Sequence, residues 1–439
     1  MDTLLVVGGG PKALAVAAKA AVMRELGLDA PRVVVVESHA VGANWLGIGG
    51  WTDGSHRLGT SPEKDIGFPY RSSVVRGHNH RINEKMLGFS WISFLIEHGN
   101  YAEWIDRGRP NPQHHRWAGY LQWVAHKIEL DLVIGTATAA TLDGDRWDVT
   151  VESADGTTTQ LDADGLMITG PGASGSALSR HPRILSIAEF WDLAGRRELP
   201  TALQAAVIGG GETAGSALNE LARHDAMTIS VISPTATLYS RGESYFENAM
   251  FSDPAKWSAL SVDQRRDVIR RTDRGVFSIR VLDSLLGDDR IYHLQGRVTG
   301  AHSRGDLVEL TLHNDSQLEQ THAFDLVVDA TGGQPLWFLD LLTPDAVDAL
   351  ELAVGWPTSQ EQIESSIGYD LAVQGLTPKL FLPNLAGVAQ GPGFPNLSSL
   401  GLLSDRVLRS PRLRAASAAS ADQRHHFVQR GTAENRGDR

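Results

Sequence analysis

The sequence predicts an α/β protein that contains two parallel β-α-β units and a small, mostly helical region between them. Two stretches predict the units: "LLVVGGGPKALAVAAKAA" near the N-terminus and "AVIGGGETAGSALN" about 200 residues later. In each, an apolar strand leads into a glycine turn and a helix, and a second apolar strand follows, ending at Glu37 and at Ser233. The polar segment from about residue 245 to 295 predicts helices. The duplicated unit predicts two Rossmann-like domains.

Composition narrows the function before any motif is considered. The 439 residues carry a formal net charge of -12 and contain no cysteine, and the sequence shows no long apolar run and no signal peptide. The negative charge disfavours nucleic acid and anionic membranes as partners, and the missing cysteines exclude disulfides and thiolate metal sites. We therefore expect a cytoplasmic protein whose chemistry is supplied by a bound small molecule.

The first glycine turn has the G-x-G-x-x-A pattern of a dinucleotide-binding loop. Its glycines allow a tight turn and a close approach of the pyrophosphate, and the alanine lets helix and strand pack closely. Proline fits the first helical position, and the acid that ends the second strand is placed to accept hydrogen bonds from ribose hydroxyls. The residues expected at this first nucleotide site are Gly8, Gly10, Pro11, Lys12, Ala13 and Glu37.

The second glycine turn repeats the pattern with Gly209, Gly211 and Ala214. Its second strand ends at Ser233, so no carboxylate is present to repel a 2′-phosphate, and NADPH is accepted. No Arg or Lys stands beside Ser233 in the sequence, the nearest being Arg241, so we expect NADH to be accepted as well. The first site is predicted to hold FAD and the second to bring the hydride donor.

Two further strand–turn phrases, "LMITGPG" and "VVDATGG", predict where the chain crosses between the two domains. The expected division is an FAD-binding part over residues 1–168 and an NADPH-binding domain over 169–331, with the helical insert at about 245–295. Residues 332–410 are expected to complete the FAD domain and the substrate region. Residues 411–439 are low in large apolar side chains and are predicted to be a disordered tail.

The class of flavoenzyme is narrowed by what the chain lacks. A disulfide reductase needs a cysteine pair, which is absent. A Baeyer–Villiger oxygenase carries F-x-G-x-x-x-H-x-x-x-W between its glycine motifs, whereas the candidate residues here, His181 and Trp191, lie too far apart for that pattern. An oxidase, a simple reductase and an amine-hydroxylating monooxygenase remain.

Several long motifs carry a family resemblance. The stretches "GGWTDGSHRLGTSPEKDIGFPYRS", "RGESYFENAMFSDP", "RTDRGVFS" and "QGPGFPNLSSLGLLSDRVL" resemble the lysine N6-hydroxylases of mycobactin- and nocobactin-type siderophore pathways. These belong to the flavin-dependent N-hydroxylating monooxygenases, which include the ornithine hydroxylases. The resemblance covers about residues 3–408. It implies an FAD domain, an inserted NADPH domain and a substrate region at their junction.

The resemblance also implies the reaction. In the family NADPH reduces FAD, O2 forms a C4a-hydroperoxide on the flavin, and the neutral side-chain amine of L-lysine takes up the distal oxygen as N6-hydroxylysine. An ornithine substrate, an NAD(P)H oxidase and a non-catalytic nucleotide sensor are the alternatives. Whether the lysine is free, acylated or carrier-bound stays open, as does a homo-oligomer.

Three substrate contacts are implied by the resemblance. Lys64 in "PEKD" is expected to hold the substrate carboxylate, although an ion pair with its flanking acids is the alternative. Asn248 in "FENAMF" is expected to contact the substrate near the nicotinamide, unless it only caps a helix. Asp273 stands where ornithine hydroxylases usually carry Asn, and it either binds the α-ammonium or caps the following turn.

The remaining implied residues surround the cofactors. Glu212 and Thr213 are expected over the nucleotide phosphates or nicotinamide, with the Glu212 side chain turned away. Trp45 and His56 are predicted flavin neighbours, with a packing Trp and a hydrogen-bonded loop His as alternatives. Gly333 replaces the usual Tyr of the A-T-G-Y ending. The adjacent histidine pairs lack a third ligand in register and are predicted to lie at the surface, without a metal: His78/His80, His114/His115 and His425/His426.

Overall fold

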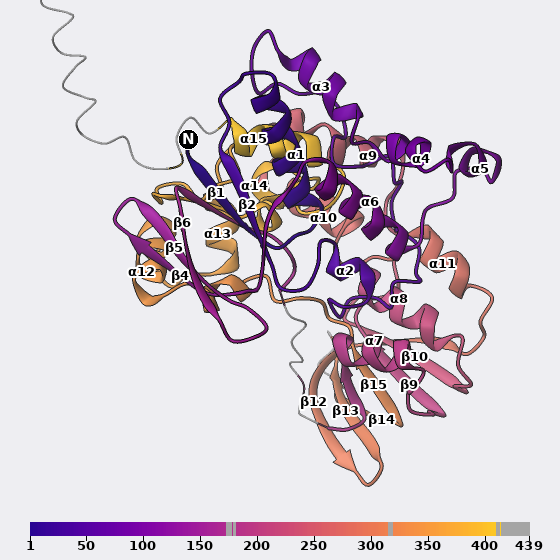
Figure 1. Ribbon diagram of the computed structural model, residues 1–439. Coiled ribbons are helices and arrows are strands. Elements are labelled where there is room, and N and C mark those ends of the chain that lie inside the picture. Colours follow the sequence, from indigo (N-terminus) through magenta and orange to yellow (C-terminus); the bar gives the residue numbers. More distant parts are fainter. Residues whose placement is uncertain (173–177, 179–180, 315–318, 410–412, 414–439) are drawn as a thin grey trace, which may run out of the picture.

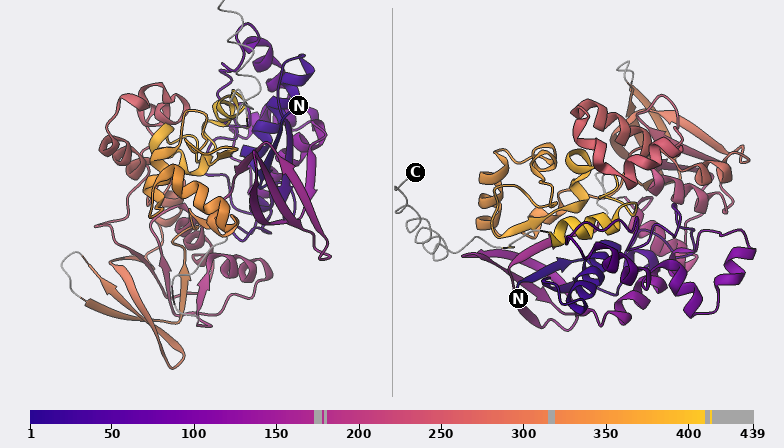
Figure 2. Two further views of the ribbon diagram at one scale, coloured as in Figure 1. Left: turned by 90° about the vertical axis from the view of Figure 1, so that its left-hand side faces the viewer. Right: turned by 90° about the horizontal axis from the view of Figure 1, so that it is seen from above.

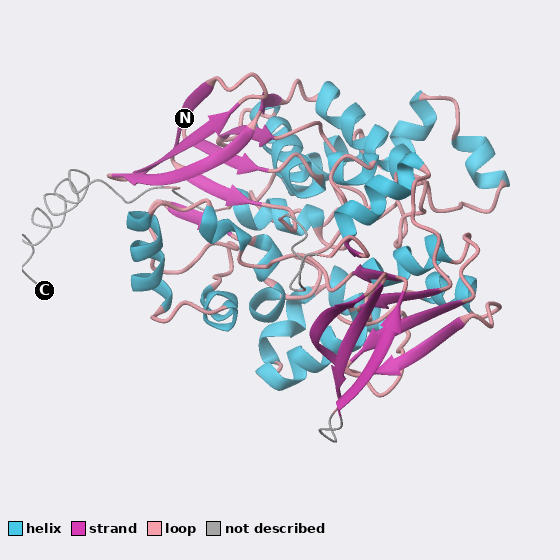
Figure 3. Cartoon of the chain, turned by 90° about the horizontal axis from the view of Figure 1, so that it is seen from below, coloured by secondary structure: helices cyan, strands magenta, loops and turns pink. Residues whose placement is uncertain are grey.

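The computed structural model describes residues 1–172, 178, 181–314, 319–409 and 413. Within them, two five-stranded parallel sheets form the centres of two domains, and each domain also carries a three-stranded antiparallel sheet. The two parallel sheets lie in different halves of the molecule (Figures 1 and 3). The predicted pair of Rossmann-like domains is confirmed.

The first parallel sheet has the strand order β16-β7-β1-β2-β3. Helix α1 connects β1 to β2, and helices α2 to α6 precede β3. The strands are β1 (Thr3–Val7), β2 (Arg32–Glu37), β3 (Asp131–Ile134), β7 (Gly165–Ile168) and β16 (Lys379–Phe381). The helices are α1 (Pro11–Glu25), α2 (Ala43–Leu46), α3 (Asn79–Leu87), α4 (Trp91–Glu97), α5 (Tyr101–Asp106) and α6 (His114–Lys127).

The second parallel sheet has the order β11-β10-β9-β15-β8, so four of its strands repeat the order of the first sheet. Its strands are β8 (Ile184–Ser186), β9 (Gln204–Ile208), β10 (Thr228–Ser233), β11 (Ile291–Gln295) and β15 (Leu326–Asp329). Helices α7 (Ile187–Arg196), α8 (Glu212–Leu221) and α11 (Ile279–Leu285) belong to this domain. The chain enters the second sheet between β7 and β8 and leaves it after β15.

The duplication extends beyond the β-α-β units. In the sequence, an antiparallel meander of three strands lies between β3 and β7, and another lies between β11 and β15. Each meander has a register shift between its first two strands. The first consists of β4 (Thr136–Asp143), β5 (Arg146–Glu152) and β6 (Thr158–Ala163). The second consists of β12 (Arg297–Arg304), β13 (Leu307–His313) and β14 (Glu319–Phe324).

The predicted helical insert is present, and its C-terminal end belongs to strand β11. It contains α9 (Tyr245–Ser252), the 3-10 helix η1 (Pro254–Ala259) and α10 (Val262–Thr272). Trp257 of η1 is buried, and its indole N–H donates to the carbonyl of Val388 at 2.8 Å. The insert therefore packs against the C-terminal part of the FAD domain (Figure 2), which includes α12 (Pro344–Val354), α13 (Gln360–Ser366) and α14 (Gly387–Gln390), with the 3-10 helices η2 (Trp337–Asp340) and η3 (Pro383–Leu385).

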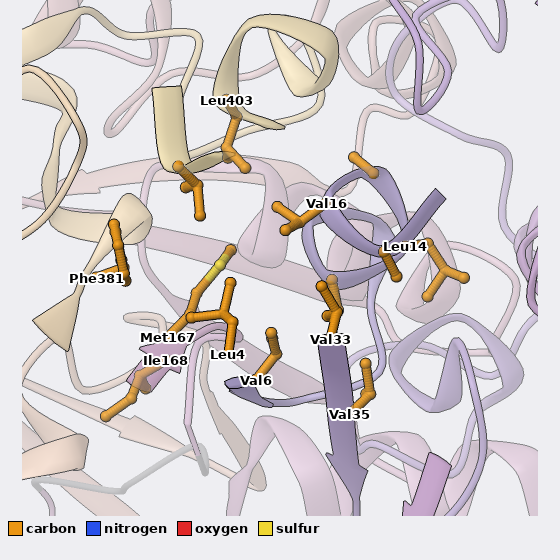
Figure 4. Packing of buried hydrophobic residues seen from close by; sticks show 14 of the residues in the cluster. Leu4, Val6, Leu14, Val16, Val33, Val35, Met167, Ile168, Phe381 and Leu403 are labelled. Carbon is orange, nitrogen blue, oxygen red and sulfur yellow. The ribbon is translucent and has the colours of Figure 1, made fainter. Parts of the chain in front are cut away.

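The core of the first domain joins the two ends of the chain. Val16 of α1 and Leu403 of α15 (Leu400–Leu408) lie in one apolar cluster with Val6 and Met167 of the sheet (Figure 4). Buried Lys19 of α1 donates to Asp405 of α15 at 2.5 Å, which pairs a charge that burial would otherwise make costly. Helix α15 is thus an integral part of the FAD domain.

The C-terminal part differs in two places from what the sequence predicts. The apolar pattern of residues 396–408 predicts a helix, but helix α15 begins at Leu400, so residues 396–399 are not helical. Leu413, the one residue of the expected tail that the structure describes, is buried, and its carbonyl accepts the N–H of Lys379 at 2.9 Å. In the described part of the chain no helix is long and apolar enough to cross a membrane.

Candidate active site

A cavity of about 1000 Å³ opens where the two domains and the insert meet. Its walls come from the first glycine turn, from the loop between α2 and α3, from the N-terminus of α8 and from residues 395–398. Twelve of the predicted site residues line it: Gly8, Gly10, Pro11, Lys12, Glu37, Trp45, His56, Lys64, Glu212, Thr213, Asn248 and Asp273. Sequence positions that are far apart are therefore brought to one chamber.

The first glycine turn has the geometry of a phosphate cradle. Gly8 has a φ of +99°, and a Cβ there would lie 2.6 Å from Thr169 Oγ1, so only glycine fits. A Cβ at Gly10 would meet nothing within 4 Å and would stand in the cavity, in the space that a pyrophosphate needs. Pro11 is the first residue of α1, whose first turn has no acidic residue, and Ala13 is fully buried behind it.

Glu37, at the end of β2, hydrogen-bonds to the backbone of the same turn. One carboxylate oxygen accepts the N–H of Gly9 at 2.7 Å, and the other accepts the N–H of His39 at 3.1 Å. The carboxylate is thereby fixed at the cavity wall, where its remaining lone pairs can accept ribose hydroxyls. These residues fit an FAD molecule bound through its pyrophosphate and ribose.

The second glycine turn repeats the backbone geometry but differs in its surroundings. Gly209 has a φ of +138°, and a Cβ there would lie 2.6 Å from the carbonyl oxygen of Ala330. Gly211 lies beside Gly275, whose backbone N would be 3.7 Å from an added Cβ. Gly209, Gly211 and Ser233 are absent from the lining of the large cavity.

Glu212 is the first residue of α8, and its side chain is directed toward Ser278 and Arg241. Its carboxylate accepts the backbone N–H of Ser278 and lies 3.7 Å from Arg241 Nη1. Burial raises the pKa of this carboxyl group, and Arg241 opposes the shift. Thr213 follows it at the cavity wall.

Lys64 lies half-buried in the cavity wall and is not paired with its neighbours in sequence. Its Nζ is 3.3 Å from Ser398 Oγ, while Asp65 accepts hydrogen bonds from Tyr70, Trp91 and Gly67 in the core. Burial lowers the pKa of Lys64, Arg241 lowers it further, and Glu243 opposes both. The ion-pair alternative with Asp65 is therefore wrong.

Asn248 also lines the cavity, and it does not cap its helix. Ser244 is the N-cap of α9, where its hydroxyl accepts the N–H of Glu247. The side chain of Asn248 donates to the carbonyl of Glu243 at 2.7 Å, which leaves its amide oxygen for another partner. The capping alternative is excluded.

Asp273 lies at the C-terminus of α10 and faces a group of polar side chains. Burial raises the pKa of its carboxyl group, and the charges of Arg274, Arg241 and Lys12 oppose the shift, together with a hydrogen bond from Asn396. Lys12 Nζ donates to the carbonyl of Pro395 at 2.6 Å. Burial lowers the pKa of Lys12 to about 8, against the charge of Asp273.

The two predicted flavin neighbours lie in different surroundings. Trp45 is half-buried and stacks edge-on against His114, with ring centroids 5.0 Å apart. His56 stacks edge-on against Trp191 of the second domain at 5.0 Å, and its Nε2 is 3.7 Å from Glu220 of α8. His56 therefore also bridges the two domains.

One expectation for the histidine pairs is wrong. His114 lines the cavity, and its Nδ1 is 2.9 Å from Thr52 Oγ1. Burial lowers the pKa of His114 to about 4, and the charge of His56 lowers it in the same direction. His115 is exposed, as predicted, and His425 and His426 lie outside the described residues. His114 is the first residue of α6 and packs against the loop that contains Thr52. The local sequence does not indicate this contact between distant segments, and the prediction was therefore wrong.

Three side chains lie close enough together to bind a metal ion, although the sequence predicted no metal site. Ligand atoms of Asp53, His56 and Glu220 lie within 4.8 Å of one another. Glu220 is already paired with Arg223 at 2.9 Å, and Asp53 accepts the N–H of Ser55 at 2.8 Å. These carboxylates have their own partners, and the arrangement needs no cation.

Sequence reasoning missed Arg241 and Asn396 as site residues. Arg241 Nη2 donates to the carbonyl of Gly59 at 3.0 Å and its Nε to Glu243 at 2.8 Å, which ties the second domain to the Lys64 loop. Both residues occur in the motifs that carry the family resemblance. The signal that could have found them is an Arg or Asn within such a motif that had been given no role.

One dinucleotide-type turn lines the cavity, and a second precedes helix α8, whose first residues also line it; together they define a two-nucleotide flavoprotein oxidoreductase. A family model described as L-lysine 6-monooxygenase/L-ornithine 5-monooxygenase matches residues 86–335. The L-lysine N6-monooxygenase MbtG of Mycobacterium sp. (strain MCS) is 55% identical over 427 residues, which cover 96% of this chain and 97% of the relative. The protein with the same name from Mycobacterium tuberculosis (strain H37Rv) is 55% identical over 92% of this chain and 94% of its own. The chain belongs to the L-lysine 6-monooxygenase/L-ornithine 5-monooxygenase family.

Solved structures agree with this assignment. The lysine monooxygenase NbtG from Nocardia farcinica has 68% sequence identity and a TM-score of 0.84, over 93% of this chain and 99% of its own. The ornithine N-hydroxylase KtzI of Kutzneria sp. 744, in a structure with reduced FAD, NADP+ and L-ornithine, has a TM-score of 0.73 at 19% identity, over 97% of this chain and 100% of its own. The second likeness supports the fold alone.

Proposed function

We propose that this protein hydroxylates the side-chain amine of L-lysine to N6-hydroxylysine, with FAD, NADPH and O2, for the biosynthesis of a hydroxamate siderophore. One observation carries the proposal: a single cavity is lined by the FAD-type turn, by the start of α8, and by Lys64, Asn248 and Asp273. An oxidase of the same fold would need the nucleotide sites but no paired cation and anion for an amino acid.

The first turn and Glu37 would hold FAD, and the second turn would bring NADPH. Reduced FAD would supply the two electrons that activate O2, so that the amine takes up one oxygen atom and the other leaves as water. The protein contributes position and a shielded environment. Trp45 and Phe251, which line the cavity, provide apolar walls that limit water near the reacting amine.

Lys64 and Asp273 would grip the two charged ends of the amino-acid backbone. Lys64 has no carboxylate within ion-pair distance among the described residues, so its ammonium is available to a substrate carboxylate. Burial raises the pKa of Asp273, and the charges of Arg274, Arg241 and Lys12 favour its carboxylate form, which would bind the α-ammonium. The side chain of lysine then extends from these anchors into the cavity.

The reacting amine must lose its proton, because free lysine has a side-chain pKa of about 10.4. The cavity wall already shows the required effect on an amine: burial lowers the pKa of Lys64, and Arg241 lowers it further. The same burial and positive charge would favour the neutral form of the substrate amine. Desolvation in the cavity would thus contribute to deprotonation of the reacting amine.

The direct test is a product assay with FAD, NADPH and O2 and either L-lysine or L-ornithine. We expect hydroxylated amine from lysine and little from ornithine, measured by mass spectrometry. NADPH consumption and peroxide without hydroxylated product from either amine would contradict the proposal for free lysine and would leave an acylated or carrier-bound lysine to be tried in the same assay.

A second test concerns Lys64. Lys64→Ala should raise the KM for lysine by about tenfold or more, because a charge-assisted hydrogen bond is lost, while flavin reduction by NADPH stays near wild type. Glu63→Ala is the matched control, since Glu63 is exposed and bonds Ser61. An unchanged KM in Lys64→Ala would show that Lys64 does not bind the substrate.

A further inference from the structure

The two domains can be aligned bond by bond at their glycine turns. Gly8 N donates to the carbonyl of Val36 at 2.8 Å, and Gly209 N donates to the carbonyl of Ile232 at 2.9 Å. The residues that follow these carbonyls are Glu37 and Ser233. Ser233 therefore occupies the position that Glu37 holds in the first domain, at the carboxyl end of the second strand.

The same equivalence appears on the neighbouring strands. The carbonyl of Glu37 accepts the N–H of Gly135 at 2.9 Å, and the carbonyl of Ser233 accepts that of Gly296 at 2.8 Å. The β-carbon of Glu37 is 3.1 Å from a Cβ built on Gly9, and that of Ser233 is 3.5 Å from one built on Gly210. In both domains this residue lies directly beside the middle glycine of the turn.

The side chains around the two positions differ in one informative way. Leu132 of β3 pairs with Val35, two residues before Glu37, whereas His293 of β11 pairs with Val231, two residues before Ser233. His293 Nε2 is 2.9 Å from Ser233 Oγ. An apolar residue in the first domain is thus replaced by an imidazole that contacts the ribose-reading position.

A third polar group completes the cluster. Thr235 Oγ1 is 2.9 Å from Ser233 Oγ and donates to the carbonyl of Thr237 at 2.8 Å. Ser233 is buried, and Thr235 and His293 are half-buried at its outer side. Two hydroxyls and one imidazole therefore converge at the end of β10, where a bound dinucleotide places its adenosine ribose.

The chemistry of this cluster favours a phosphate over a free ribose hydroxyl. Glu37 carries a negative charge and would repel a phosphate, whereas the neutral side chains of Ser233 and Thr235 do not repel one. An imidazole ring donates in either protonation state; burial lowers the pKa of His293, and an anion beside the ring would oppose that shift. The absence of a neighbouring Arg or Lys in the sequence is compensated by a residue from the adjacent strand.

We propose that His293, with Ser233 and Thr235, binds the 2′-phosphate of NADPH and so determines the preference for NADPH over NADH. The inference rests on the proposed use of a nicotinamide dinucleotide at the second turn. It assigns the discrimination to a side chain that lies 60 residues from Ser233 in the sequence.

The test uses the FAD-loaded enzyme and two probes, 2′,5′-ADP and 5′-AMP, with binding measured by calorimetry. Wild type should bind 2′,5′-ADP more tightly than 5′-AMP. His293→Leu introduces the residue type of Leu132, its counterpart in the first domain. This variant should weaken the binding of 2′,5′-ADP on the order of tenfold and leave the binding of 5′-AMP unchanged. His302→Leu, at an exposed histidine of β12, is the matched control and should bind both probes like wild type.

Two further variants sharpen the result. His293→Gln keeps a hydrogen-bonding group beside Ser233 and serves if the leucine variant does not fold; it should also weaken 2′,5′-ADP. Ser233→Glu should invert the preference, so that the kcat/KM for NADH exceeds that for NADPH. Unchanged 2′,5′-ADP binding in folded His293 variants, or a loss seen only in Arg297→Ala beside Gly296, would overturn the inference.

The outcome is separable from the proposed function. If wild type distinguishes the two probes and His293→Leu does not, the inference holds even when no lysine is hydroxylated. If lysine is hydroxylated but the two probes bind wild type equally, the inference fails while the proposed function stands.

Discussion

The two glycine turns share their backbone bonds and differ in the first residues of the helices that follow them. Helix α1 begins with Pro11 and Lys12, and α8 begins with Glu212 and Thr213. The Glu212 carboxylate is turned toward Ser278 and Arg241, but it still adds negative charge near the start of α8, where a phosphate would bind. We therefore expect the first turn to bind its nucleotide more tightly than the second.

The first turn also has more open space in front of it than the second. A Cβ at Gly10 would stand free, whereas Gly210 and Gly211 face the backbone of Gly275. The first cradle opens into the large cavity, while the loop after α10 lies against the second. We expect the same motif, placed in these two surroundings, to hold one cofactor tightly and to let the other exchange.

The largest expected effect separates the two turns by backbone strain. Gly8→Ala and Gly209→Ala each force a positive φ on alanine, which costs on the order of 2 kcal/mol. Gly8→Ala should lose FAD, and Gly209→Ala should keep FAD but lose reduction by NADPH. Flavin absorbance and the rate of anaerobic reduction measure the two effects. Equal FAD loss in both variants would contradict the division of roles.

A milder pair tests the phosphate cradles without strain. Gly10→Ala should fold normally and fall at least tenfold in FAD affinity, because the methyl group takes the space of the pyrophosphate. Gly211→Ala should keep FAD and weaken NADPH instead. Gly119→Ala, in helix α6 with nothing within 4 Å, is the control and should change neither cofactor. FAD retained in Gly10→Ala would place the pyrophosphate elsewhere.

A pH dependence of stability is expected from the FAD side of the cavity. The folded protein keeps His114 neutral down to a pKa of about 4, whereas the unfolded chain takes up a proton near pH 6.5. The free energy of unfolding should therefore fall as the pH drops from 6.5 to 4. His114→Gln should flatten this slope in denaturant titrations at several pH values, and His115→Gln, at the exposed neighbour, should not.

The smallest effect concerns the C-terminal end. A chain that ends at Leu413 should match the full-length protein in FAD content and thermal stability. A chain that ends at Arg409 should melt a few degrees lower, because it loses the buried Leu413 side chain, worth about 2 kcal/mol. Equal melting temperatures would show that the contact with Gly165 contributes little.

Much of the fold could be read from the sequence because its signals are local. The apolar strands, the glycine turns and the helix from Pro11 to Glu25 have the periodicities of their final structures. The duplicated meander was missed because short strands such as β6 are mostly exposed and carry little apolar alternation. The buried pair of Lys19 and Asp405 was also missed, since nothing local indicates which helices pack together.

The site could be predicted in its members and less well in its contacts. Lys64, Asn248 and Asp273 were found through motifs, and the structure brings all three to one cavity. Arg241 and Asn396, which oppose the effect of burial on the pKa of Asp273, come from other elements, and so does His293 beside Ser233. Such neighbours depend on strand order and loop packing, which single-sequence patterns do not specify.

The division of the first sheet has a consequence for the order in which the protein is made. Strand β16 and helix α15 reach the ribosome exit only after the whole second domain has been synthesised. The second domain has all the strands of its sheet by Asp329, so it can fold while the first still lacks an edge strand and the partner of Lys19. The part of the chain that is synthesised first is therefore completed last, and it cannot present a finished FAD site until the far end has arrived.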